Sequence, residues 1–531
     1  GPFFALFFCL FSHLTYAGEK CMQGVSVRKR SPYSPISTTD RSAEEGAFNM
    51  SDQVGMENSR DRGHANPMST PMPDEEDPHL ISLLGAENKG SVGRIWLMSF
   101  VIGLAAFLFG YDTANLNGPL SPGFNASITF ANSSTQVGIL QAAALAGAGI
   151  GAMTLNLPAE AMGPRRALLL NNIPYIVGSV ISAVYPNFWL LLVGRVIIGY
   201  AVGNASVLVP MLLGDISTPA IRGRIGIVNQ LMITVGIFVA QLIFFGVEDM
   251  KIGWQIALGI GAVPAGVQLG LFFLIPNSAS WLVKKGRVEE AAAVLLKIRP
   301  PGHDTMQEVR DMQAARSKSA KTATWKQLFR ERRLVFIAIG CMAAQQLSGI
   351  NAVMYYSSTL LKNAGLIGRS AVIGSLSITA LNVIMTFVTV PIVDRAGRKP
   401  LLLASTGVMV ASLIALAVAL LVPHQVMEGE SDPAAIASVA LVMLFVAGFA
   451  IGLGAVLWPL LTEIHPDDLR PKGMSLSLAS NWSFNLILTL LVPTLISGLG
   501  GGDEKKGSAY LFIIFCVVSA LAFVFLLLLV P

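Results

Sequence analysis

The sequence predicts an all-α membrane protein, with twelve transmembrane helices in two pseudo-symmetric six-helix bundles and a cytosolic helical middle loop. Three observations support this prediction. Of the 531 residues, 53% are hydrophobic and only 13% are charged, with a mean hydropathy of +0.61; a soluble protein carries about a quarter charged residues. Twelve apolar stretches have about the 20 residues that a helix needs to cross a bilayer. Finally, motifs in the first six stretches recur in the last six.

The predicted helices occupy the chain from residue 94 onward. We expect the first bundle at 93–275, the middle loop at 276–333 and the second bundle at 334–531. Residues 1–92 are expected to form a disordered cytosolic tail, because most of this segment is rich in Ser, Pro, Met and charge. The individual helices are expected at 94–114, 136–156, 167–185, 189–212, 225–246, 253–275, 334–361, 370–393, 399–422, 435–461, 474–497 and 508–530.

The basic residues predict which way the bundles face. The middle loop holds 13 Lys or Arg, and the loops after helices 2, 4, 8 and 10 add nine more, whereas the opposite loops hold only five. This imbalance places the middle loop and both termini in the cytosol, most simply at the plasma membrane. The net charge of +5 then reflects topology in the lipid bilayer, and no nucleic-acid binding is predicted.

Charged motifs recur at matched positions in the two halves. The stretch from Asp215 to Arg222 closes helix 4, and the stretch from Glu463 to Arg470 closes helix 10, each with an acid seven residues before an arginine. Such a repeat predicts a binding site between two bundles near the bilayer midplane. The motifs are expected to bond across the seam and hold the cytosolic face shut, although they could also be ordinary positive-inside anchors. The predicted cytosolic gate network comprises Asp215, Arg222, Asp394, Arg395, Arg398, Glu463 and Arg470.

Polar side chains inside apolar helices are the candidate site. A bilayer offers amides no partner, so they must bond within the bundle, either to a substrate or to neighbouring helices as packing contacts. Amides both donate and accept hydrogen bonds, which suits a neutral solute covered in hydroxyls. The candidates are Asp112, Arg195, Gln230, Gln345, Gln346, Asn351, Asn382, Trp458, Asn481 and Asn485.

Helix 7 is predicted to be broken. Gln345 and Asn351 would lie about 120° apart on an unbroken helix, so both can face one cavity only if the helix bends or unwinds. Ser348 and Gly349 lie between them, and discontinuous helices commonly build transporter sites. The sequence therefore predicts a break at Ser348-Gly349.

Other signals for an enzyme or a cofactor are lacking in the sequence. The four cysteines are scattered without metal-ligand or disulfide spacing, and no phosphate-binding loop or catalytic triad is found. We therefore predict no enzyme activity, cofactor, catalytic residue or metal. The glycines at 147, 149 and 151 lie inside helix 2, where close helix packing is the better interpretation.

The chain resembles the sugar porters (hexose transporters) of the major facilitator superfamily over roughly residues 94–531. QQLSGINAVMYYS at 345–357 is close to the family's helix-7 signature, and DRAGRKP at 394–400 resembles the loop after its helix 8. GR at 194–195, the Asp215 to Arg222 block and NW at 481–482 also fit. The resemblance implies a monosaccharide substrate of glucose type and transport by alternating access.

The resemblance also implies residue roles. It assigns the extracellular gate to Tyr355 and Tyr356 and glycosylation to Asn125, with Asn132 as a second acceptor. The chain departs from the family at PNSASWL, 276–282, and at GLGAVLW, 452–458, which lacks the prolines that usually break helix 10 and so predicts stiffer gating or a weaker inward lock. The implied sugar-binding residues are Gln230, Gln345, Gln346, Asn351, Asn382, Trp458, Asn481 and Asn485.

Asp112 is the residue that decides whether sugar transport is driven by protons or is passive. Proton symporters of the family carry an aspartate here, paired with the arginine that matches Arg195, whereas many passive members carry asparagine. An arginine that moves away would let the carboxylate take up a proton, so we favour the proton as a co-substrate. A passive hexose facilitator, a proton-coupled polyol or inositol transporter and a non-transporting sugar sensor remain alternatives.

Overall fold

The computed structural model describes residues 78–117, 119, 133–184, 187–218, 221–300, 302–319, 324–366, 369–422, 433–466 and 469–530. All of them belong to one compact unit, Glu75–Pro531. Every element described in this unit is a helix. Among these residues, eleven helices are long and apolar enough to cross a membrane.

The first half of the unit contains five of these crossings and a sixth that is interrupted. The sixth is divided into short helices around Gly261 and Leu271, so that no single piece reaches spanning length. The bounds are α2 Pro78–Ala114, α3 Ser134–Thr154, α4 Asn156–Met162, α5 Pro164–Leu170, α6 Asn172–Val184, α7 Phe188–Ile216, α8 Arg222–Val247, α9 Gly253–Gly259, α10 Ala262–Gly270 and a 3-10 turn at Phe272–Leu274.

The first helix begins earlier than the sequence suggested. α2 starts at Pro78 rather than at the expected bundle boundary of residue 93. Proline suits the first turn of a helix, where its missing N–H would have no partner. No further proline follows before Ala114. The helix therefore continues through the polar residues before residue 93, which were expected to lie outside it.

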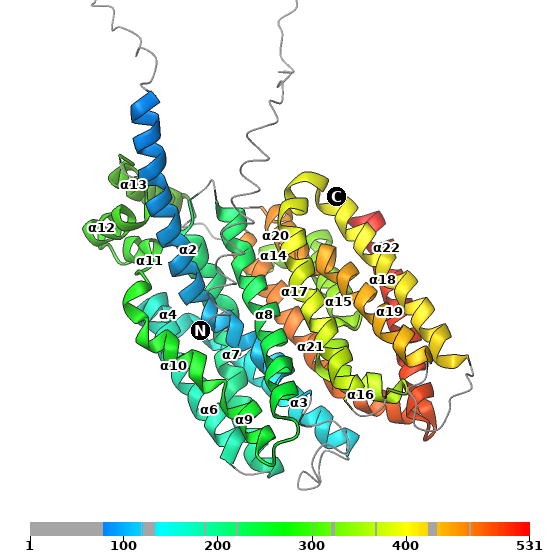
Figure 1. Cartoon of the computed structure of the whole chain (residues 1–531). Coiled ribbons are helices and arrows are strands. Elements are labelled where there is room, and N and C mark those ends of the chain that lie inside the picture. The colour runs from blue at the N-terminus through cyan, green and yellow to red at the C-terminus, as the bar shows by residue number, and fades with distance from the viewer. Residues whose placement is uncertain are drawn as a thin grey trace, which may run out of the picture. The chain divides into compact units, whose positions relative to one another are not determined.

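The middle loop folds as four short helices, and the second half follows as six crossings. The middle-loop helices are α11 Ala279–Lys284, α12 Val288–Ile298, α13 Thr305–Ser319 and α14 Trp325–Arg330. They lie at one end of the bundle, at the top of Figure 1, which we call the middle-loop end; α16 lies at the opposite, far end. The second half comprises α15 Arg332–Leu347, α16 Ile350–Asn363, α17 Ser370–Ala396, α18 Arg398–Leu421, α19 Pro433–Phe449, a π-helical segment Ala450–Gly454, α20 Leu457–Ile464, α21 Arg470–Gly500 and α22 Glu504–Leu529.

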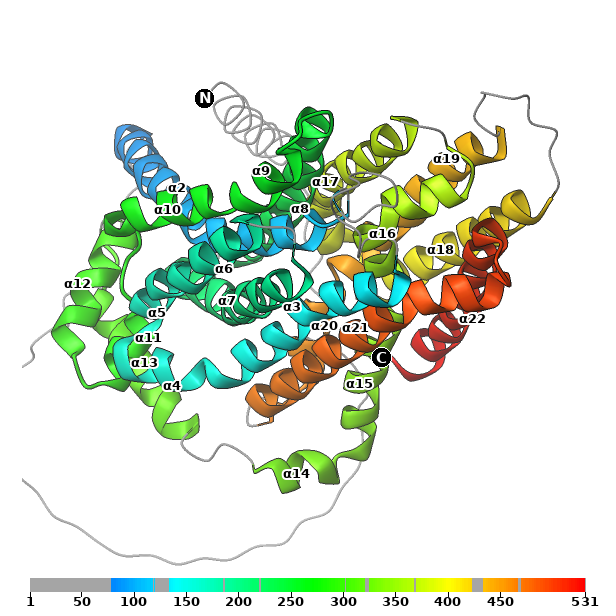
Figure 2. The same ribbon diagram turned by 90° about the horizontal axis from the view of Figure 1, so that it is seen from below.

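The two halves meet along two pairs of helices. α3 of the first half packs against α21 of the second, and α8 packs against α17. Figure 2, seen from the far end, shows both pairs side by side. Residues between these four helices therefore lie at the junction of the halves.

Glycines allow α3 and α7 to approach closely. A Cβ at Gly147 would overlap the carbonyl oxygen of Val196, and one at Gly151 would overlap that of Tyr200. The packing prediction for the glycine run is thus confirmed at these two positions, while Gly149 has open space beside it.

Two crossings of the second half are broken near their middle. α15 ends at Leu347 and α16 begins at Ile350, with Gly349 between them at φ +95°, which confirms the predicted break. Only glycine adopts this backbone conformation without strain. Helix 10 is also broken, by the π-helical segment Ala450–Gly454, although the prolines expected at such a break are missing there.

Candidate functional site

A cluster of amides, buried except for the partly exposed Asn351, forms around the break in helix 7. Gln345 donates from Nε2 to the carbonyl oxygen of Leu453 at 2.7 Å, and its Oε1 accepts from Nδ2 of Asn481 at 2.8 Å. Gln346 donates to Gln345 Oε1 at 3.4 Å and accepts from Nδ2 of Asn351 at 2.5 Å. α15, α16, α21 and the π-helical segment each contribute to this cluster. It offers donors and acceptors but no charge.

The break is what brings Gln346 and Asn351 together. Side chains five residues apart point about 140° away from each other on a continuous helix. The turn at Gly349 redirects α16, so that Asn351 faces back toward Gln346. Local backbone conformation therefore builds the amide cluster.

The two predicted gate tyrosines are buried against α21. Asn485 donates to the hydroxyl oxygen of Tyr355 at 3.2 Å, and Tyr356 donates from its hydroxyl to the carbonyl oxygen of Thr489 at 3.1 Å. Tyr356 has non-helical backbone angles, φ −126° and ψ 16°, so that α16 is kinked there. The kink lies at the junction where a gate would have to move.

A buried ion pair lies in the first half, opposite Tyr355. Nη1 of Arg195 on α7 donates to Oδ1 of Asp112 on α2 and also to Oδ1 of Asn115 at 3.3 Å. The side chains of Asp112 and Arg195 are 6% and 2% exposed. A carboxylate and a guanidinium so far from water depend on each other for charge compensation.

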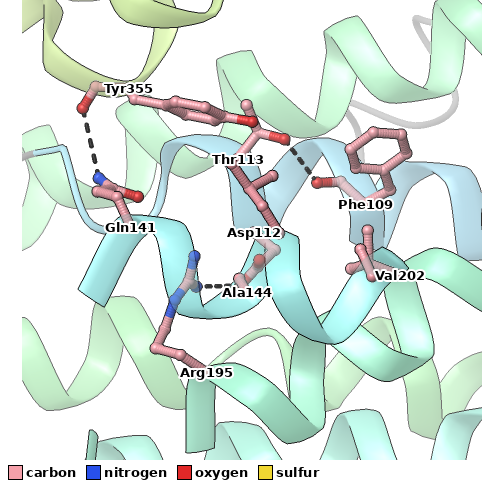
Figure 3. Close-up of a pocket in the computed structure, with 10 residues that line it drawn as sticks. Phe109, Asp112, Thr113, Gln141, Ala144, Arg195, Val202 and Tyr355 are labelled. Carbon is pink, nitrogen blue, oxygen red and sulfur yellow. Dashed lines mark hydrogen bonds and ion pairs between the residues drawn. The ribbon is translucent and has the colours of Figure 1, made fainter. Parts of the chain in front are cut away.

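The pair borders a cavity of about 10 Å³ (Figure 3), enough space for about one water molecule. Figure 3 also shows Gln141, on α3, donating to the backbone carbonyl oxygen of Tyr355 at 3.5 Å. The cavity thus lies where the two halves meet. Its lining residues are Phe109, Asp112, Thr113, Gln141, Ala144, Leu145, Ala148, Arg195, Val202 and Tyr355.

Three predicted site residues are placed apart from the amide cluster. Asn382 is buried on α17, whereas Gln230 on α8 and Trp458 on α20 are partly exposed. Among the described residues, no hydrogen bond joins their side chains to the cluster. Asn382 belongs to a row of buried polar side chains at helical spacing on α17, which also includes Ser375, Thr379, Thr386 and Thr389.

Sequence reasoning missed several polar groups at the junction. Gln141 is buried within α3 in a stretch, 137–153, that is otherwise apolar, and Asn115 follows Asp112 by one turn. Trp482 on α21 packs against Phe109 on α2 across the junction, with ring centroids 5.7 Å apart. Gln141 could have been found as an isolated glutamine within an apolar stretch. The contact of Trp482 with Phe109 joins residues far apart in the sequence, so no local pattern could have predicted it.

At the middle-loop end, the predicted gate residues form several bonds within one half or to the middle loop. Asp215 accepts hydrogen bonds from the hydroxyls of Ser278 and, at 2.6 Å, Ser280. These two serines belong to the PNSASWL stretch, so hydroxyls there bond the carboxylate. Arg398 pairs with Glu463 at 3.2 Å, within the second half.

Arg470 donates to the carbonyl oxygens of Thr462 at 2.8 Å and His465 at 3.3 Å. The side chains of Arg222, Asp394 and Arg395, together with the predicted glycosylation positions Asn125 and Asn132, lie outside the described residues.

At the far end, hydrogen bonds join the two halves directly. Nδ2 of Asn117, just after α2, donates to the hydroxyls of Ser357 at 2.5 Å and Ser375 at 3.3 Å. Oδ1 of Asn117 accepts from the backbone N–H of Ser358 at 3.2 Å. All four residues are buried. Asn117 therefore joins the end of α2 in the first half to α16 and α17 in the second.

These features define a class of protein: a secondary transporter, in which two helical bundles enclose a buried polar site formed at broken helices. The comparisons with known proteins agree. The family model described as "Sugar (and other) transporter" matches residues 98–531. The chain belongs to this family, whose members are transporters and not enzymes, and it has the twelve-helix fold of the major facilitator superfamily.

Relatives and a solved structure resemble most of the chain. The glucose transporter GlcP of Staphylococcus epidermidis is 34% identical over 435 residues, which cover 81% of this chain and 93% of the relative. The galactose-proton symporter of Escherichia coli is 31% identical over 82% of this chain and 92% of its own. A solved proton:xylose symporter of the major facilitator superfamily, bound to 6-bromo-6-deoxy-D-glucose, has a TM-score of 0.70 at 25% identity, over 83% of this chain and 97% of that one.

Proposed function

We propose that this protein carries monosaccharides of the glucose type across the membrane by alternating access, coupled to protons through Asp112. The observation that carries the proposal is the amide cluster around Gln345: uncharged donors and acceptors, buried at a helix break. Sugar hydroxyls both donate and accept hydrogen bonds and can replace these mutual bonds one for one. A charged substrate would instead need a charged cavity.

The relatives support this substrate class. The names of the two relatives and the solved structure specify glucose, galactose and xylose. We propose that the sugar is bound by amides from both halves, with Trp458 stacking on its apolar face. The proposed binding residues are Gln230, Gln345, Gln346, Asn351, Asn382, Trp458, Asn481 and Asn485.

We propose that the middle-loop end is cytosolic and the far end extracellular, in the plasma membrane. The positive-inside imbalance of the loops supports this orientation. The two bundles, 93–275 and 334–531, would then rock about the site, with Tyr355 and Tyr356 gating the extracellular face. In this orientation the described closure at Asn117 is on the outside.

Proton coupling is proposed to depend on the pair of Asp112 and Arg195. While paired, the carboxylate remains charged. When rocking separates the guanidinium from it, the buried carboxylate takes one proton from the outer water, and it releases that proton inside when the pair re-forms. The carboxylate and Tyr355 line one cavity, so the state of the proton and the position of α16 can influence each other.

The test is uptake of labelled glucose by a host that lacks its own hexose transporters, with a competition panel of hexoses, pentoses, inositol and polyols. Uptake inhibited by hexoses is expected; inhibition by inositol or polyols alone would reassign the substrate. Binding without uptake would mean a sensor.

Coupling is tested separately in the same cells. Sugar addition should alkalinise the medium, and Asp112→Asn should abolish accumulation while sparing exchange across the membrane. Unchanged accumulation in that variant would reject the proton route and leave a passive facilitator.

A further inference from the structure

An exposed pair of aromatic rings lies on α14, the middle-loop helix that directly precedes the second half. Trp325 and Phe329 are 44% and 53% exposed, and their rings stack with centroids 6.2 Å apart and planes 27° apart. Two large rings left together in water are unfavourable, and such a surface usually meets a partner or a membrane. The amide cluster of the proposed sugar site plays no part in this feature.

α14 is fixed in place, so the exposure of these rings is a property of the fold. Leu328 between them is fully buried and packs with Leu469. A capping box joins Thr324 and Gln327 at the start of the helix. The helix is thus anchored through Leu328 while the two rings remain outside.

Cations lie next to the two rings in the sequence, and one from α21 lies against Trp325. Lys326, Arg330, Arg332 and Arg333 are all exposed, and none of them forms an ion pair with another described residue. Nζ of Lys472 lies 5.3 Å from the centroid of the Trp325 ring. Glu331 is the only acid between residues 324 and 333. The patch therefore carries an excess of positive charge.

The position of these rings and cations, next to a membrane-spanning helix, indicates which molecule binds there. The membrane-spanning stretch of α15 begins at Arg332, directly after α14, so the patch lies at the boundary between hydrocarbon and water. Tryptophan and phenylalanine are suited to that boundary, and clustered Lys and Arg next to a spanning helix attract anionic headgroups. Guanidinium groups bind phosphate oxygens in bidentate geometry.

We propose that this basic–aromatic patch, formed by Trp325, Phe329, Lys326, Arg330, Arg332, Arg333 and Lys472, is a docking site for the headgroup of an anionic phospholipid in the leaflet at the middle-loop end. The rings lie among the upper acyl carbons and the glycerol, while the cations bond the phosphate. A soluble protein partner fits less well, because the rings are continuous with a spanning helix and cannot leave the bilayer surface.

The site has a consequence for transport, which depends on the proposed function. The helix that begins at Arg332 ends at Gln345 and Gln346, beside the break. A bound headgroup therefore fixes one end of the helix that carries the amide cluster. Glucose uptake by proteoliposomes should be faster when the bilayer contains phosphatidylglycerol than in phosphatidylcholine alone.

The direct test does not require transport. The full-length protein is reconstituted in phosphatidylcholine containing equal small fractions of either brominated phosphatidylglycerol or brominated phosphatidylcholine, which quench tryptophan on contact. The difference between the native protein and Trp325→Phe isolates Trp325 among the seven tryptophans. We expect the anionic lipid to quench Trp325 more strongly, and a change of Arg332→Gln with Arg333→Gln to lower that preference about fivefold for each charge removed.

The matched control removes two other exposed cations, by Lys297→Gln with Arg310→Gln on α12 and α13, and should keep the preference. Equal quenching by both lipids would overturn the proposal, and so would the absence of quenching, which would place the rings in water, where a soluble partner could reach them. Loss of the preference in inorganic phosphate, but not in chloride of the same ionic strength, would mean a free-phosphate site instead. A loss of sugar uptake with the lipid preference intact would count against the proposed function alone.

Discussion

The guanidinium of Arg369, just before α17, lies 2.5 Å from Oε1 of Glu248, just after α8, and this ion pair joins the two halves of the protein at the far end. Arg369 also donates to the carbonyl oxygen of Phe245 at 3.1 Å and lies 4.5 Å from the centroid of its ring. One side chain of the second half thus holds the end of a helix of the first. The bond must break whenever the far end opens.

We expect Arg369→Ala to favour the open far end. Glu248 would be left without its main partner. An ion pair that is half exposed contributes about 0.5–1 kcal/mol, so its loss should shift the equilibrium between the closed and the open far end two- to fivefold toward the open state. The readout is the labelling rate of Thr379→Cys by a membrane-impermeant maleimide, with native cysteines replaced by serine. Thr379 is fully buried, one helical turn beyond Ser375 on the same face, so labelling reports opening. Arg310→Ala is the control, and an unchanged rate in Arg369→Ala would exclude a latch.

The same pair predicts a pH dependence of opening. Burial raises the pKa of Glu248 above its ordinary value, against the opposing effect of Arg369. Asp249 and Lys362 also act on this carboxyl, in opposite directions. The closed far end therefore binds a proton more readily than the open one, so closure gains stability as the pH falls through the raised pKa and loses it as the pH rises through it. Labelling of Thr379→Cys, corrected at each pH for the intrinsic reactivity of an exposed thiol with maleimide, should slow as the pH falls through the raised pKa of Glu248.

Glu248→Gln should remove this dependence and slow labelling at pH 7, because a neutral amide is buried more cheaply than a carboxylate. A slope that persists in this variant would assign the pH effect to another group.

The break in helix 7 shows how far local sequence could predict the site. The separation of Gln345 and Asn351 on a continuous helix, with glycine between them, was enough to predict where α15 ends, and the structure has the break there. The twelve crossings followed from hydropathy for the same reason: each depends on residues close together in the chain. What the amides contact across the bundle depends on distant segments, and this was not predictable.

Helix 10 illustrates the part that could not be predicted. Because GLGAVLW at 452–458 lacks the usual prolines, stiffer gating or a weaker inward lock was expected, yet the backbone is interrupted at Ala450–Gly454. The N–H of Leu453 donates to Ser405 Oγ at 3.2 Å, and its carbonyl oxygen accepts from Gln345. Side chains from α18 and α15 thus bond backbone groups at the break. Those partners are 48 and 108 residues away, beyond any local pattern.

Gly349→Ala should disable the protein through its fold. A Cβ at this position would overlap the ring of Phe515, and alanine at φ +95° adds about 1–2 kcal/mol of backbone strain. We expect loss of most of the detergent-stable monomer in size-exclusion chromatography after heating. Phe515→Ala removes the overlap but not the strain, so Gly349→Ala should cost less stability in the Phe515→Ala background than in the native protein. An equal cost in the two backgrounds would place the whole effect in the backbone.

The middle-loop helices should loosen in acid. Arg299, which also donates to the carbonyl oxygen of Ile216, bonds Glu308 through Nε at 3.0 Å and Nη2 at 2.7 Å. These hydrogen bonds hold the pKa of Glu308 below its ordinary value. A lowered carboxylate pKa contributes stability above the ordinary value of 4.5, and this stability is lost as the pH falls through the lowered pKa.

Protection of α12 and α13 against amide hydrogen exchange, corrected for the intrinsic pH effect, should therefore decline below about pH 4.5. In Glu308→Gln the protection should be lower at neutral pH and nearly independent of pH. A native-like decline in that variant would point to other carboxylates.

Asn481→Ala tests the amide cluster against a neighbour on the same helix. Asn481 supplies the hydrogen bond to Oε1 of Gln345, and its removal leaves a buried acceptor without that donor, at a cost of about 1–3 kcal/mol. If sugar hydroxyls bind to these groups, the KM for glucose should rise about five- to hundredfold. The free energy of unfolding should fall by less than the free energy that corresponds to this change in KM. Ser483→Ala is the matched control, because Ser483 is exposed and, among the described residues, its hydroxyl donates to the carbonyl oxygen of Ala479 in its own helix and to no other group. If the two substitutions change KM equally, or if Asn481→Ala lowers stability without changing KM, the amides of the cluster stabilise the packing of the helices and do not bind the sugar.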